Sequence, residues 1–188
     1  MVRTAPDQTA ITLKQYLEFE ATSPVRHEFV DGFLFAMAGA SDPHNLISGN
    51  IFAQVRLAAR GTQCRAYQSD MKVLVDKKVY YPDVLLTCHP DDAGQIAKQH
   101  PCFIVEVLSD STEVIDRIEK FAQYRQFESL QLYVLVHQTK AHLEYYRKQN
   151  SGQWLFGEII GQGNLEFPCV NLTLSLEEIY EDVDLPIA

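Results

Sequence analysis

Apolar positions fall in short runs that are bounded by turn-forming residues along most of the chain. Such runs, rich in β-branched and aromatic residues, predict β-strands. An Asp31-Gly32 pair between two apolar runs is typical of a hairpin. The other predicted strands are residues 64–68, 71–75, 79–87, 102–108, 130–136, 142–147 and 154–160.

Helices are predicted where a capping residue precedes apolar positions at helical spacing. Asp42-Pro43 supplies an N-cap followed by a proline at the first helical position. A glycine near the expected end of that helix favours termination there. The predicted caps are Thr12 for a helix to about Phe19, Asp42 for a helix ending near Gly61, residues 109–112 for a helix to about Phe127, and Ser175 for a short final helix.

The helix that residues 109–112 open has a predicted apolar side and a polar side. Asp116 and Lys120 fall largely on the polar side at i, i+4 spacing. A surface ion pair between them is the simplest account of these two residues. The predicted apolar side carries Val114, Ile115, Ile118, Phe121, Ala122 and Arg125.

Strands and helices follow one another without an internal repeat or a linker, so we predict one α+β domain over residues 1–188. A length of 188 residues with 46% hydrophobic residues suffices for a sizeable core. The apolar runs are too short to span a membrane, and the N-terminal residues lack the apolar core of a signal peptide. We therefore expect a soluble, cytoplasmic protein with no membrane partner.

Charge and cysteine usage narrow the function classes. The net charge is −9, with 16 Lys and Arg against 25 Asp and Glu, which disfavours a protein that coats nucleic acid. An enzyme with clustered acids and local DNA contacts remains compatible with this charge. The four cysteines form no CxxC pair, so reduced thiols are predicted. A zinc site would require a folded-back loop carrying Cys88, His89, His100 and Cys102.

Two acids stand within apolar runs. Asp83 opens the run after Pro82, and Glu106 lies inside the run of residues 102–108. A buried carboxylate is costly unless a cation or a hydrogen-bond donor offsets its charge. Two such acids on neighbouring strands predict a site for Mg²⁺ or Mn²⁺, with the Val107 carbonyl as a further ligand. The chemistry that this site favours is phosphodiester hydrolysis.

The order of these motifs resembles the PD-(D/E)XK nucleases, and more closely a bacterial family of unknown function described as putative restriction endonucleases. The resemblance implies a restriction-endonuclease-like core, in which helices flank a central mixed β-sheet. It also implies a metal-dependent endonuclease acting on DNA, with a homodimer as the expected assembly. The matching residues are His27, Glu28, Asp31, Gly32, His44, Asp70, Lys72, Pro82, Asp83, Glu106, Asp116, Lys120 and Tyr124.

The resemblance assigns Asp83, Glu106, Glu28 and Lys120 to catalysis. The superfamily pattern has lysine two residues after the second acid, where this chain has Leu108. Lys120 on the following helix is the matching position in the closer family. Lys72, two residues from Asp70 and on the same strand face, is a second candidate.

Three residues are expected at the margin of the site, and each also has a structural explanation. Glu28 could face solvent before a hairpin, and Asp70 could mark a turn. His44, one residue past Pro43, could cap or pack a helix. The alternative function is a non-enzymatic nucleic-acid or protein interaction module on the same fold. That module would not depend on a divalent metal at Asp83 and Glu106.

Overall fold

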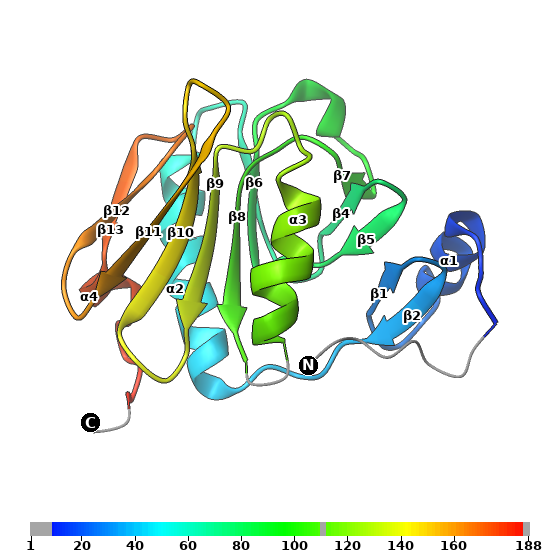
Figure 1. The fold of residues 1–188 in the computed structure, drawn as a ribbon, viewed down its shortest axis with the longest axis horizontal. Helices are drawn as coiled ribbons and strands as arrows, with labels where there is room; N and C mark the ends of the chain where they lie inside the picture. The colour runs from blue at the N-terminus through cyan, green and yellow to red at the C-terminus, as the bar shows by residue number, and fades with distance from the viewer. Residues whose placement is uncertain (1–8, 110–111, 186–188) are drawn as a thin grey trace.

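The computed structural model describes residues 9–109 and 112–185. Its centre is a six-stranded sheet of order β11-β10-β9-β8-β6-β3 (Figure 1). β8 and β9 are parallel, whereas the other neighbours are antiparallel, so the sheet is mixed. Its strands are β3 (Arg65–Gln68), β6 (Val84–Thr87), β8 (Pro101–Leu108), β9 (Leu132–His137), β10 (His142–Lys148) and β11 (Trp154–Ile160).

Helices cover both faces of this sheet. α2 (Asp42–Ala58) lies on one face, and η2 (Ile115–Lys120) continues into α3 (Phe121–Tyr124) on the other (Figure 1). Ile51 of α2 packs into a cluster with residues of β6, β8 and β9, while Tyr124 of α3 packs into a second cluster on the opposite face. Because β8 is buried along its whole length, any polar side chain on it must find a partner inside the protein.

A smaller sheet of order β2-β1-β5-β4-β7 packs beside the central one. α1 (Leu13–Glu20) covers it, and Tyr16 stacks on Phe29 with ring centroids 5.0 Å apart. Its strands are β1 (His27–Val30), β2 (Phe33–Ala36), β4 (Lys72–Val75), β5 (Lys78–Tyr80) and β7 (Ala97–Lys98). The remaining elements are η1 (Pro90–Asp92), β12 (Asn164–Phe167), β13 (Leu172–Ser175) and α4 (Leu176–Ile179).

The predicted hairpin at Asp31-Gly32 is confirmed, with φ of 52° and 92° at its two turn residues. The capping box at Thr12 is also confirmed. α2 starts one residue earlier than expected, because Ser41 rather than Asp42 accepts the capping hydrogen bond. The prediction did not include β12 and β13.

The single strand predicted over residues 79–87 is wrong. The chain leaves β5 at Tyr80 and enters β6 at Val84, and the two strands belong to different sheets. Pro82 lies between them and has no N–H to donate to a ladder. The interruption places Asp83 at the junction of the two sheets.

The predicted orientation of the helix after residue 112 is also wrong. Val114 and Ile118 are 44% and 68% exposed, whereas Asp116 and Lys120 are 1% and 5% exposed. Residues 115–120 form a π-helix, whose wider turn does not follow the α-helical spacing used for the prediction. Asp110 and Ser111 of the predicted cap lie outside the described residues.

The prediction of reduced thiols is wrong as well. Disulfides join Cys64 to Cys88 and Cys102 to Cys169. Cys64 and Cys88 flank the paired strands β3 and β6, while Cys102 on β8 meets the segment between β12 and β13. The spacing of the cysteines does not reveal these pairings, because they depend on which strands are neighbours. Since Cys88 and Cys102 are both disulfide-bonded, neither can be a ligand of the zinc site considered above.

None of the helices in the described ranges is long and apolar enough to cross a membrane.

Candidate functional site

A buried lysine lies among three carboxylates between the two sheets. The Nζ of Lys120 is 3.1 Å from Glu28 Oε1, 3.2 Å from Glu106 Oε1 and 3.0 Å from Asp116 Oδ1. All four residues are at most 5% exposed. The Asp116–Lys120 pair is therefore real, but it lies inside the protein and not on the surface.

Asp83 lies beside this group, immediately before the neighbouring strand β6. The register that pairs Val84 with Val105 sets Asp83 across from Glu106. Its Oδ2 accepts a 2.7 Å hydrogen bond from the backbone N–H of Val107 and lies 3.2 Å from His44 Nε2. Val107 thus contributes a backbone N–H that holds Asp83, whereas the prediction concerned its carbonyl.

Four separate parts of the chain converge here. Glu28 comes from β1 of the smaller sheet, Glu106 from β8, Lys120 from η2, and His44 from the first turn of α2. They line a cleft of about 750 Å³. A site assembled from elements of two sheets and two helices is positioned by the packing of the whole fold.

Negative charge exceeds positive charge in this cleft. Of its described lining residues, Arg26 and Lys120 carry permanent positive charge. Even with His44 protonated, the carboxyl groups outnumber the cations. The lining acids are Glu28, Asp70, Asp83, Glu106 and Asp116.

This imbalance shifts the ionisation of the central groups. Burial raises the pKa of Glu106 well above its ordinary value; Lys120 opposes this shift, while Asp116, Asp83 and Glu28 add to it. Burial lowers the pKa of Lys120, but the carboxylates of Asp116, Glu106 and Glu28 outweigh burial and hold its pKa well above the ordinary value. Lys120 is therefore charged, and a further cation would favour ionised Glu106.

His44 is the histidine of the cleft. Burial lowers its pKa, but the hydrogen bond to Asp83 and the charge of that carboxylate raise it more, so the net pKa is above 6.5. Its Nδ1 is buried and has no hydrogen-bond partner within residues 9–109 and 112–185. The ring thus holds Asp83 through Nε2.

Two tyrosine contacts and the burial of Asp116 are not predicted from the sequence. Tyr124 OH donates a 2.9 Å hydrogen bond to Glu106 Oε1, and Tyr133 OH donates a 3.0 Å bond to the Asp116 carbonyl. The i−4 spacing of Asp116 from Lys120 was the signal that could have placed this acid in the site.

Asp70 and Lys72 lie further out. Asp70 lines the cleft, but its carboxylate is 75% exposed and lies 3.5 Å from Arg26. Lys72 is not among the described lining residues; its Nζ lies 5.1 Å from the ring centroid of Tyr81. Of the two candidate lysines, Lys120 contacts the acids.

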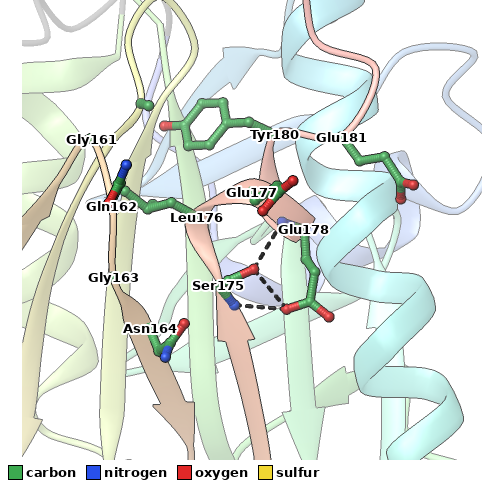
Figure 2. Close-up of a pocket in the computed structure, with 11 residues that line it drawn as sticks. Gly161, Gln162, Gly163, Asn164, Ser175, Leu176, Glu177, Glu178, Tyr180 and Glu181 are labelled. Atoms are coloured by element: carbon green, nitrogen blue, oxygen red, sulfur yellow. Dashed lines mark hydrogen bonds between the residues drawn. The ribbon is translucent and has the colours of Figure 1, made fainter.

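A second hollow of about 760 Å³ lies between the β11–β12 turn and α4 (Figure 2). Glu178 at its edge is committed to the helix cap, because it accepts hydrogen bonds from Ser175 N and Oγ. Gly161 and Gly163 on the facing turn carry no side chain. Figure 2 shows no cluster of acids around a cation like that of the first cleft.

The donor set of the acidic cleft fits a hard divalent cation. Carboxylate oxygens are the ligands that Mg²⁺ and Mn²⁺ prefer. The surplus of acids in the cleft supplies the charge that such an ion would offset. Asp83 and Glu106, on adjacent strands, are the residues that would hold it.

The chain belongs to the Uma2 family, described as putative restriction endonucleases, which it matches over residues 13–178. It is 34% identical over 170 residues to the uncharacterized protein slr1290 of Synechocystis sp., covering 89% of this chain and 90% of that protein. It is also 32% identical over 163 residues to sll1609 of the same organism, covering 84% and 92%.

The fold matches a solved structure, that of a putative nuclease from Anabaena variabilis. The TM-score is 0.72 at 15% identity, and the match covers 90% of this chain and 97% of that one. The predicted restriction-endonuclease-like core, a central mixed sheet flanked by helices, is confirmed. At this identity the likeness concerns the fold alone.

Proposed function

We propose that this protein is a Mg²⁺- or Mn²⁺-dependent endonuclease that hydrolyses phosphodiester bonds of DNA. The observation that carries the proposal is the buried group of acids around Lys120, with Asp83 and Glu106 on adjacent strands. In a structural ion pair the positive and negative charges balance, whereas in this group the carboxylates outnumber the ammonium of Lys120. The family description points to the same class of reaction.

In this proposal Asp83, Glu106 and the Val107 carbonyl would hold the ion. When bound, the ion polarises the phosphate and activates a water molecule. Tyr124 and the Val107 N–H fix the two carboxylates through the hydrogen bonds that they donate to Glu106 and Asp83. Such outer partners orient the groups that bind a metal.

Lys120 is the proposed cation for the reacting phosphate. Its ammonium stabilises the negative charge that develops on phosphate oxygens and favours ionisation of a nearby water. Glu28 and Asp116 hold the ammonium in place from the other side. His44 orients Asp83 through Nε2, and its buried Nδ1, which has no partner among the described residues, is the proposed donor or acceptor for substrate.

Two surface features of the protein bear on its partners. DNA contacts would be local, because the chain as a whole is acidic, and Arg26 at the cleft is a candidate phosphate ligand. A homodimer through the late strands is proposed from Leu155 and Phe156, which are 54% and 50% exposed on edge strand β11. We further propose a soluble protein that works in the cytoplasm.

The test is cleavage of plasmid and single-stranded DNA by the purified protein with Mg²⁺, with Mn²⁺ and with EDTA. Asp83→Asn and Glu106→Gln remove the acids at nearly unchanged volume. Asp91→Asn is the matched control, because it changes another Pro-Asp pair in an exposed turn. We expect metal-dependent cleavage by the wild type and the control, and loss of cleavage in the two site variants.

Cleavage that persists in both site variants would overturn the site assignment. A wild type that neither cleaves DNA nor binds Mg²⁺ or Mn²⁺ in calorimetry would favour the interaction module. One observation favours that alternative: the Lys120 ammonium already occupies the space among three carboxylates.

A further inference from the structure

A second group of potential metal ligands lies on one face of the hairpin formed by β9 and β10. His137 ends β9, His142 starts β10, and Glu144 follows two residues later. The register that pairs Leu143 with Val136 sets His142 across from His137. Residues two apart on a strand share a face, so all three side chains project from the same side of the sheet.

These three side chains are close together and largely withdrawn from solvent. Their ligand atoms all lie within 4.8 Å of one another, and the residues are 8–9% exposed. The two imidazoles stack at a centroid distance of 4.5 Å, and His137 Nε2 is 3.2 Å from Glu144 Oε1. Because one tight hairpin supplies all three, little chain entropy is lost in assembling them.

The neighbouring strand adds a carboxylate that suits a metal-bound histidine. Glu158 on β11 pairs with Glu144 in register, and its Oε2 lies 3.2 Å from His142 Nε2. A carboxylate on one ring nitrogen fixes the tautomer and directs the other nitrogen to a metal. Two carboxylates directly opposite each other on a sheet also repel unless a cation lies between or beside them.

A cation from the protein already occupies this position. The Arg117 guanidinium contacts Glu144, lies 3.2 Å from His137 Nε2, and is held from behind by Glu113 at 2.9 Å. The Arg117 side chain is 25% exposed and extends from η2, so it is not part of the hairpin that carries the three ligands. The position therefore holds positive charge, and its present occupant comes from a separate element.

We propose that His137, His142 and Glu144 form a zinc-binding site that Arg117 closes when no metal is bound. Two imidazoles and a carboxylate are a ligand set that selects Zn²⁺ over Mg²⁺ and leaves a fourth position for water. Glu158 supports His142, and Arg117 competes with the ion for Glu144.

This site is separate from the acidic cleft. Glu106 aligns with Leu135 and Leu135 with Glu144, so the two acids are two strands apart, or about 10 Å. Zinc binding here does not depend on the proposed nuclease activity. A readout of binding therefore tests this site even if the protein cleaves no DNA.

The experiment is calorimetric titration of the full chain with ZnCl₂ after treatment with a chelator, together with the visible absorption of the Co²⁺-substituted protein. Glu106→Gln is included to remove binding at the acidic cleft. We expect zinc to bind in this background, and His142→Gln and Glu144→Gln to weaken that binding by roughly tenfold or more. Circular dichroism checks that these variants are folded.

Arg117→Ala supplies a result that misfolding would not mimic. Removal of the competing guanidinium should tighten zinc binding, with the same Co²⁺ spectrum as the parent. The proposal is overturned if zinc does not bind to the parent or to Arg117→Ala. It is equally overturned if folded His142→Gln and Glu144→Gln bind zinc as the parent does.

Discussion

Two buried lysines in this fold have opposite surroundings. Lys98 is 2% exposed and donates two 2.7 Å hydrogen bonds to the carbonyls of Asp92 and Gln95, with its Nζ 4.9 Å from the Tyr67 ring centroid. Lys120 is 5% exposed and lies among three carboxylates. Both lysines bury a charge, so burial of a charge alone does not identify a functional site.

The acids beside these two lysines, Asp92 and Glu106, also have opposite surroundings. Asp92 accepts hydrogen bonds from Thr87 Oγ1 at 2.6 Å and from the N–H groups of Gln99 and His100 at 2.8 and 3.1 Å. Burial raises the pKa of Asp92, but these donors outweigh it and hold the pKa below 3.8. Glu106 has neighbouring acids, and its pKa is raised. An acid whose oxygens are held by hydrogen-bond donors, such as Asp92, has a structural role. An acid among other acids that outnumber the cations, such as Glu106, indicates a place for a cation.

The largest expected effect separates the two lysines by activity. Lys120→Met should lower the rate of DNA cleavage by about 10²–10³-fold, because it removes the cation at the developing charge. Lys98→Met should cleave at the wild-type rate per folded molecule, with a lower melting temperature. Single-turnover cleavage assays on matched amounts of folded protein make this comparison.

Lys72→Met belongs in the same assay. If that variant loses cleavage while Lys120→Met keeps it, the outer lysine serves the reaction and the comparison of the two buried lysines fails.

The next effect concerns stability. Asp92→Ala should cost about 3 kcal/mol in the free energy of unfolding, because several buried donors lose a charged acceptor. Glu28→Gln should cost less than about 1 kcal/mol, since it relieves repulsion among the acids of the cleft. Urea unfolding followed by circular dichroism measures both, and equal losses would contradict the distinction.

A stabilising effect of Mn²⁺ of similar size is expected at the cleft and not around Asp92. Mn²⁺ at 100 times its dissociation constant should stabilise the wild type by about 2.7 kcal/mol, because the ion binds the folded state. Asp83→Asn should lose this gain, whereas Asp92→Asn should keep it. Thermal unfolding with and without Mn²⁺, with EDTA as the reference, reports the difference; an equal gain in both variants would place the ion elsewhere.

The smallest effect is a dependence of stability on pH. The pKa of Asp92 is lower in the folded protein than its ordinary value of 3.8, so its ionised form stabilises the fold. That contribution is fully present above the unfolded pKa and is lost as the pH falls through the folded pKa. Asp92→Asn should flatten the acid limb of the stability curve, and an unchanged acid limb would speak against this role.

The local sequence pattern predicted those parts of the fold that depend on residues close together in the sequence. The Asp31-Gly32 turn, the capping boxes and the strand around Glu106 each follow from residues a few positions apart. The strand predicted across Pro82 failed, because two sheets compete for residues that look continuous in sequence.

In the candidate site too, some residues could be predicted from the local sequence and others could not. Asp83 and Glu106 could be selected because an acid inside an apolar run has few solvated alternatives. The inward position of Lys120 was not evident, because the π-helical turn changes which residues face the sheet. The hydrogen bond from Tyr124 to Glu106 became visible only once α3 was placed over β8.

Residue type and short-range spacing were enough to predict the fold class, the two strand acids and the family resemblance. Three further features depend on the packed chain: Glu28 and Lys120 join those acids, the cysteines pair, and His137, His142 and Glu144 share one face. These contacts join residues whose proximity depends on sheet order and helix geometry. Their positions follow from the burial of the whole core, which no local pattern contains.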